Sequence, residues 1–229
     1  MYDLDGTLFD TLPDLETAVN LALTERGHRT VGLEEVRSAI GDGARALIER
    51  LSPPGTAALE IEAIHARFGV HYLGVCREHS TLREGSLGFV RNRAEDAPGR
   101  FQAILTNKPQ APTDLLVEQS GLRPSIGRSL GGDTALGKKP DPTGLQALMR
   151  WAGSDARQTL VIGDGPADLA VARAAGVDAV RMDGGYGQNR ELDHLPYTWR
   201  VGSFSELESL WPWIEPVKDL QHPLGDGWH

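Results

Sequence analysis

From about residue 85 onward, short apolar runs alternate along the chain with stretches of helical periodicity. Strands alternating with helices form a parallel sheet whose two faces the helices cover. We therefore predict an α/β fold with a Rossmann-like, doubly wound parallel sheet as its core. The predicted strands are 101–105, 159–162 and 177–182, and the predicted helices are 113–119, 143–152 and 167–175.

Residues 13–79, in contrast, have the periodicity of successive helices. Apolar side chains recur at helical spacing, first from Leu15 to Leu23 and later from Ile61 to Val75. An all-helical insert of this length is typical of a separate cap domain. We predict a catalytic core of residues 1–12 and 84–215, a helical cap of residues 13–83, and an irregular C-terminal tail at 216–229.

Polar segments stand at or near the ends of the strand candidates. Asp3, Thr106 and Asp164 each follow or end one of these strands. Ligands of open parallel sheets bind outside the carboxyl ends of the strands, so the fold would bring these residues to one edge. The segments are Asp3-Leu4-Asp5-Gly6-Thr7, Leu105-Thr106-Asn107-Lys108-Pro109, Lys138-Lys139-Pro140-Asp141-Pro142 and Gly163-Asp164-Gly165-Pro166-Ala167-Asp168.

Asp3 and Asp5 are two residues apart, so they point the same way where the backbone is extended. One carboxylate can attack phosphorus and form an aspartyl-phosphate, which divides one hard displacement into two easier ones. A second can protonate the leaving alkoxide and then activate water, an effect of roughly 10²–10⁴-fold. Taken alone this segment is better explained as an acidic turn, but with the other segments it predicts a nucleophile and a general acid/base.

Two segments offer groups that bind phosphate. Thr106 and Asn107 supply a hydroxyl, an amide and backbone N–H groups, and Lys138 and Lys139 supply ammonium groups. An ammonium near the phosphoryl oxygens would offset their charge and that of the carboxylates. We predict phosphate contacts from Thr106, Asn107 and Lys139, although spacing alone does not decide which lysine points inward.

The last segment predicts a metal site. Asp164 and Asp168 span a turn between a strand and a helix, and near Asp3 they would repel one another unless a cation lay between them. Mg²⁺ prefers oxygen ligands and is usually bound by a few protein oxygens together with water and substrate phosphate. Asp168 also suits the N-terminus of a helix as an acid, and both roles can hold together.

The net charge and composition of the chain limit the kinds of molecule that it could bind. The net charge of −9 argues against nucleic acid, whose phosphates recruit basic surfaces. Cys76 is the only cysteine, which fits a reducing compartment. No apolar run approaches the length that spans a bilayer, and the first residues do not resemble a signal peptide. We expect a cytoplasmic protein that acts on a small molecule; its oligomeric state stays open.

With its polar segments taken together, the chain resembles the haloacid dehalogenase superfamily of phosphatases, and most closely the phosphoglycolate phosphatase group with a helical cap after the first motif. The likeness runs from Asp3 to about Leu210. Further similar segments are Asp14-Leu15, Gly41-Asp42-Gly43 and Gly131-Gly132-Asp133.

The resemblance implies a role for each candidate residue. Asp3 would be the nucleophile and Asp5 the general acid/base. Thr106 and Lys139 would hold the phosphoryl group, which favours Lys139 over Lys138. The implied Mg²⁺ ligands are Asp3, the backbone carbonyl of Asp5 and Asp164, with Asp168 supporting the ion directly or through water.

The leading functional hypothesis is a Mg²⁺-dependent phosphatase that hydrolyses a small phosphomonoester such as 2-phosphoglycolate. Arg45, in the cap, is a candidate for binding a substrate carboxylate, although a solvated helix arginine is the simpler interpretation. One alternative is a phosphomutase of the same fold, of the β-phosphoglucomutase type. Another is a catalytically silent binding protein, because only Met1 and Tyr2 precede Asp3 and the first core strand is therefore very short.

Overall fold

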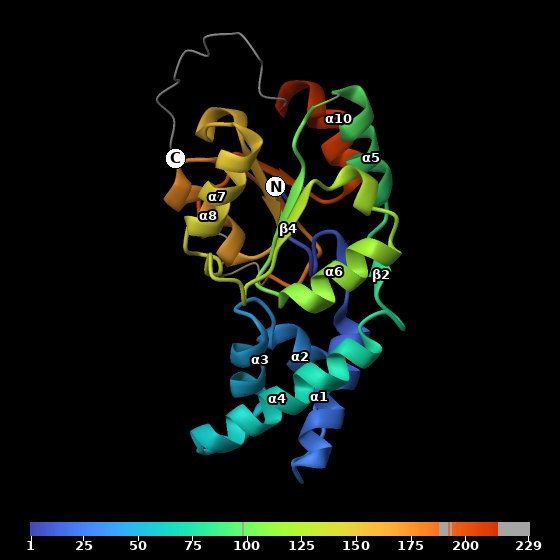
Figure 1. Cartoon of the computed structure of the whole chain (residues 1–229), viewed down its shortest axis with the longest axis vertical. Coiled ribbons are helices and arrows are strands. Elements are labelled where there is room, and N and C mark those ends of the chain that lie inside the picture. Colours follow the sequence, from blue (N-terminus) through green and yellow to red (C-terminus); the bar gives the residue numbers. More distant parts are fainter. Residues whose placement is uncertain (98, 188–191, 193, 215–229) are drawn as a thin grey trace.

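The computed structural model describes residues 1–229 except 98, 188–191, 193 and 215–229, so the predicted tail at 216–229 lies outside the described residues. A parallel sheet forms the centre of the molecule (Figure 1). In it β3 pairs with β4, β5 with β6, and β6 with β7. The strands are β3 (Ala103–Leu105), β4 (Arg128–Leu130), β5 (Leu160–Gly163), β6 (Asp178–Met182) and β7 (Trp199–Val201).

The first residues of the chain occupy the middle of this sheet. Tyr2 forms parallel bridges to Ile104 of β3 and to Ile162 of β5, which gives the order β4-β3-Tyr2-β5-β6-β7. Tyr2 N–H donates to Ala103 O at 2.9 Å, and on the other side Asp3 N–H donates to Ile162 O at 2.9 Å. The short strand is thus hydrogen-bonded on both sides, and Asp3 stands at its carboxyl end.

Helices cover both faces of the sheet. Along β3, Ile104 packs into one apolar cluster while Ala103 and Leu105 pack into another, as expected when successive side chains point to opposite faces. Helices α5, α6 and α10 contribute to the first cluster, and α7 and α8 to the second. The doubly wound α/β fold predicted from the sequence is confirmed. The bounds are α5 (Ser86–Asp96), α6 (Gln110–Gln119), α7 (Thr143–Ala152), α8 (Pro166–Ala175) and α10 (Phe204–Ile214), with short 3₁₀ turns at Arg123–Ser125 and Ala156–Gln158.

A second group of helices lies beyond the carboxyl edge of the sheet, in the blue and cyan part of Figure 1. These helices enclose their own apolar cluster, which includes Leu15, Ile48, Ile64 and Phe68. They are α1 (Leu12–Glu25), α2 (Leu33–Ala39), α3 (Ala44–Leu51) and α4 (Ala58–Val75), and we call them the cap helices. No helix within the described part of the chain is long and apolar enough to span a bilayer.

Two short antiparallel strands, β1 (Phe9–Asp10) and β2 (Thr81–Leu82), join the cap helices to the sheet. Buried Asp14 strengthens this connection, because it accepts hydrogen bonds from His79 N–H at 2.9 Å and from Ser80 N–H at 2.8 Å. The predicted domain boundaries at 12/13 and 83/84 lie next to these strands and stay predictions.

Candidate active site

A cavity of about 310 Å³ lies between the carboxyl edge of the sheet and the cap helices. Its sheet side is lined by residues from all four polar segments of the sequence, and its cap side by Leu47, Phe68 and Tyr72, among others. Three of these segments begin at the end of a strand or directly after Tyr2, so the topology of the sheet brings them together. The segment Lys138–Pro142 follows β4 after an intervening loop of residues 131–137.

Asp3 and Lys139 form the centre of the cavity's sheet side. Lys139 Nζ lies 2.7 Å from Asp3 Oδ1 and 2.6 Å from Asp168 Oδ1, and the lysine side chain is almost fully buried. Burial raises the pKa of Asp3 to about 6; repulsion from Asp168 adds to this shift and Lys139 opposes it. Burial lowers the pKa of Lys139, but attraction to Asp168 and Asp3 outweighs it and leaves a raised pKa. Lys139 therefore remains an ammonium ion.

Asp164 is held by hydrogen bonds from both sides. Thr7 Oγ1 donates to its Oδ1 at 2.5 Å, and Tyr186 N–H donates to its Oδ2 at 2.7 Å. The loop containing Tyr186 comes so close that a Cβ atom at Gly185 would lie 2.2 Å from Asp164 Oδ2. Burial, followed by repulsion from Asp3, raises the pKa of Asp164 to about 6.

Asp3, Asp164 and Asp168 form a cluster that could hold a metal ion. Each offers one carboxylate oxygen, and these oxygens all lie within 4.8 Å of one another. Lys139 supplies one positive charge to three carboxylates, so the cluster has an excess of negative charge in a buried place. A cation bound by these oxygens would relieve their repulsion. The donor set and the charge of this cluster fit a divalent ion that prefers oxygen.

Asp5 lies at the same cavity with a different set of partners. Its Oδ1 is 2.8 Å from Lys108 Nζ and accepts a hydrogen bond from Thr11 Oγ1 at 2.7 Å. Lys108 also donates to the hydroxyl of Tyr72 on cap helix α4 and lies 4.4 Å from the centroid of its ring. These contacts link Asp5 to the cap helices.

The two predicted phosphate-binding residues after β3 differ in their surroundings. Thr106 is buried at the cavity, and its hydroxyl accepts from Lys108 N–H at 3.3 Å. The side-chain amide of Asn107 instead donates to Gly41 O in the cap at 2.9 Å and to Lys139 O at 3.0 Å. Asn107 thus links a cap loop to the loop that contains Lys139. Because its side-chain amide is used in this link, the backbone N–H of Asn107 is the group that could donate a hydrogen bond to phosphate.

Arg45 is not brought to the cavity. Its guanidinium group lies 2.8 Å from Glu62 and 3.1 Å from Glu49, and its side chain is half exposed. The cavity wall nearby contains Arg50, which pairs with Asp42 and donates to Ala39 O at 3.0 Å. Among the contacts of the described residues, none supports a substrate role for Arg45.

Sequence reasoning missed Lys108, Tyr72 and Tyr186. The Tyr186 hydroxyl donates to Asp10 Oδ1 at 2.6 Å and accepts from Thr11 N–H at 2.7 Å, so it ties the sheet edge to the start of α1. The available signals were Lys108's position directly after Asn107 and the three glycines around Tyr186.

Comparison with known proteins agrees with this geometry. The family model of the haloacid dehalogenase-like hydrolases matches residues 1–176. A phosphoglycolate phosphatase of Rhodospirillum rubrum is 34% identical over 221 residues, which cover 93% of this chain and 89% of that protein. One of Pseudomonas fluorescens is 35% identical over 198 residues, covering 84% of this chain and 71% of the relative.

Solved structures have the same fold. A predicted phosphoglycolate phosphatase from Haemophilus somnus has a TM-score of 0.82 and 26% identity, with 91% of this chain and 95% of that one covered. CbbY from Rhodobacter sphaeroides, solved in complex with phosphate, has a TM-score of 0.76 and 23% identity, with 90% and 94% covered, a likeness that concerns the fold alone. The chain belongs to the haloacid dehalogenase-like hydrolase family, in its phosphoglycolate phosphatase-like group, and is a phosphoric monoester hydrolase.

Proposed function

We propose that this protein is a Mg²⁺-dependent phosphatase that hydrolyses 2-phosphoglycolate, or a closely similar small phosphomonoester, through an aspartyl-phosphate on Asp3. The observation that supports this most is the meeting of Asp3, Asp164, Asp168 and Lys139 at one cavity. The names of the sequence relatives support the substrate, and the cavity of about 310 Å³ suits a small one.

In the first step an oxygen of Asp3 attacks phosphorus. A P–O bond forms to Asp3 while the P–O bond to the leaving group breaks, and the electron pair goes to the leaving alkoxide. Asp5 gives a proton to that alkoxide. In the second step Asp5 takes a proton from water, the water oxygen attacks phosphorus, and the P–O bond to Asp3 breaks. Inorganic phosphate leaves and both carboxyl groups return to their starting states.

Positive charge and hydrogen-bond donors hold the phosphoryl group. We assign this role to the ammonium of Lys139, the hydroxyl of Thr106 and the backbone N–H of Asn107. The metal ligands are Asp3, Asp164 and Asp168, with the backbone carbonyl of Asp5 as a further ligand. When bound, Mg²⁺ offsets the charge of the carboxylates and of the transferring phosphoryl group. A cytoplasmic location stays a prediction from the sequence.

The test is phosphate release from a panel of esters headed by 2-phosphoglycolate and including a hexose 1-phosphate, with Mg²⁺ or with chelator. We expect release that requires the metal and that disappears in Asp3→Asn. Isomerisation of the sugar phosphate without net release would favour a phosphomutase. A folded, Mg²⁺-replete sample that releases phosphate from no ester would leave the binding protein as the better hypothesis.

A further inference from the structure

Lys108 is a buried cation at the cavity that the catalytic scheme does not use. Its side chain is 1% exposed, yet it lines the cavity. A hydrogen bond anchors the backbone at this position, because Gly132 N–H donates to Lys108 O at 2.9 Å.

The ammonium of Lys108 has hydrogen-bonding capacity to spare. An ammonium group has three N–H donors. The contacts found among the described residues use two of them, for Asp5 Oδ1 and the Tyr72 hydroxyl. One donor is therefore left for a ligand in the cavity.

The other cations of the described cavity wall are committed elsewhere. Lys139 lies between Asp3 and Asp168, where the phosphoryl group is proposed to bind. Arg50 pairs with Asp42 and is nearly half exposed. Among the cations of the described cavity wall, Lys108 is thus the buried one that is left to contact the rest of the substrate once the phosphoryl group is placed.

The position of Asp5 shows which part of the substrate Lys108 would reach. A general acid must lie within hydrogen-bond reach of the ester oxygen that it protonates. Lys108 Nζ is 2.8 Å from Asp5 Oδ1, so it lies near the same oxygen. In an ester whose phosphate-bearing carbon also carries a carboxylate, the carboxylate oxygens are about 3 Å from the ester oxygen. A carboxylate there falls within reach of Lys108.

We infer that Lys108 binds the substrate's carboxylate and makes the site selective for phosphomonoesters with a carboxylate on the phosphate-bearing carbon. This inference rests on the proposed function, since it takes Asp5 as the residue beside the ester oxygen. The aromatic ring of Tyr72 and the apolar Leu47 and Phe68 close the cap side of the same space. These three side chains carry no charge.

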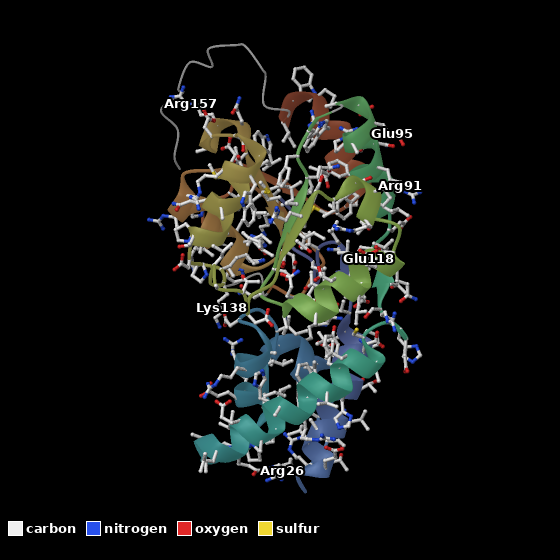
Figure 2. All side chains as sticks on the ribbon, in the orientation of Figure 1. Arg26, Arg91, Glu95, Glu118, Lys138 and Arg157 are labelled. Carbon is white, nitrogen blue, oxygen red and sulfur yellow. The ribbon has the colours of Figure 1, made fainter. Side chains whose placement is uncertain are left out.

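The experiment compares each carboxylated ligand with a neutral partner of similar size. Turnover is measured with 2-phosphoglycolate and ethyl phosphate. Binding is measured by calorimetry in Mg²⁺ with 3-phosphonopropionate and propylphosphonate, which cannot be hydrolysed. The variant is Lys108→Met, which keeps an unbranched side chain only one atom shorter and removes the charge. The matched control is Lys138→Met, because Lys138 lies at the surface (Figure 2), where it donates to Asp42 O at 2.6 Å.

We expect Lys108→Met to reduce the preference for the carboxylated ligand by about 10- to 100-fold in both measurements, the effect of one charge-assisted hydrogen bond. Lys138→Met should keep the parent's preference. Where Lys108→Met does not melt cooperatively, Lys108→Gln replaces it with the same expectation.

The two proposals fail in distinguishable ways. If the parent hydrolyses neither ester but Lys108→Met loses the binding preference, the hydrolytic function is wrong and the role of Lys108 stands. If the folded variant keeps the preference, or if the parent has none in binding, the role assigned to Lys108 is wrong whatever the activity.

Discussion

Lys108 Nζ lies 2.8 Å from Asp5 Oδ1, and Thr11 Oγ1 donates to the same oxygen at 2.7 Å. Two groups from different parts of the chain therefore hold one carboxylate. Thr11 precedes the first cap helix and Lys108 follows β3, so the position of Asp5 depends on both the cap helices and the sheet. A carboxylate held in this way suits proton transfer, which requires a fixed geometry.

Asp5→Asn should lower kcat for 2-phosphoglycolate by about 10²–10⁴-fold with little change in KM, because it removes proton transfer and keeps the shape of the side chain. Asp141→Asn is the control, since Asp141 is an exposed carboxylate whose Oδ1 accepts from Thr143 N–H. Steady-state kinetics check both. Equal rates in the parent and Asp5→Asn would exclude Asp5 as the general acid/base.

The buried carboxylates make the stability of the metal-free protein depend on pH. Asp3 and Asp164 both have a pKa raised to about 6, chiefly by burial. The unfolded chain releases these protons near pH ~4, so the stability they contribute is complete below that pH and is lost as the pH rises through about 6. Asp164→Asn should lose less stability, because it lacks one of these carboxyl groups. Its free energy of unfolding relative to the parent should therefore increase as the pH rises from about 4 to about 6.

Urea unfolding in chelator, at intervals from pH 4 to 7.5, measures this difference. Adding Mg²⁺ at pH 7 should stabilise the parent, because a ligand of the folded state alone raises the free energy of unfolding. Asp164→Asn should gain much less. A difference between parent and variant that does not change with pH would contradict the raised pKa values, and equal stabilisation by Mg²⁺ would exclude Asp164 as a ligand.

Asn107→Ala should destabilise the protein by about 1–2 kcal/mol, because it leaves two carbonyl oxygens without their donor. It should also raise KM, since the cap loop at Gly41 loses its link to the Lys139 loop. Asn20→Ala is the matched control, because Asn20 makes two hydrogen bonds to Val31 within the cap, at 2.7 and 3.0 Å. We expect a similar loss of stability in urea unfolding but an unchanged KM for this control.

Arg45→Ala should change kcat/KM by less than about two-fold, because exposed ion pairs contribute little and the guanidinium is paired with Glu49 and Glu62. Kinetics with 2-phosphoglycolate check this. A ten-fold or larger loss of kcat/KM, seen only with carboxylated substrates, would indicate that Arg45 binds the substrate carboxylate and would argue against that role for Lys108.

Much of the sheet and its helices could be predicted from the sequence. The helix predicted at 143–152 is α7 (Thr143–Ala152), because Leu145 and Leu148 recur at helical spacing and bury against the sheet. The carboxylates could be placed as well, since Asp3 and Asp164 stand at the ends of strands and parallel strands end at one edge. Pattern and topology point to the same answer at these positions. Lys139 directly follows none of the predicted strands, and only the resemblance to the family favoured it over Lys138.

Helix α5 was harder to identify because a charged residue takes part in its buried face. Arg93 is 4% exposed, pairs with Asp96 and Glu208 at 2.7 Å, and lies 5.0 Å from the Trp211 ring centroid. A search for apolar residues at helical spacing does not identify a buried position that is occupied by a charged residue. The sequence did not predict Tyr72 and Lys108 as site residues for a different reason. Their contact exists only once cap helix α4 lies over the loop after β3.

Trapping the phosphorylated enzyme is the most direct test of Asp3 as the nucleophile. Asp5→Asn is mixed with p-nitrophenyl phosphate, whose leaving group needs no proton, and quenched in acid within milliseconds. Borohydride reduction then converts an aspartyl-phosphate into homoserine, which peptide fragmentation locates. We predict homoserine at position 3, and none in protein that also carries Asp3→Asn. Nitrophenol release from Asp5→Asn with an unmodified Asp3, or with homoserine at another aspartate, would contradict the proposed mechanism.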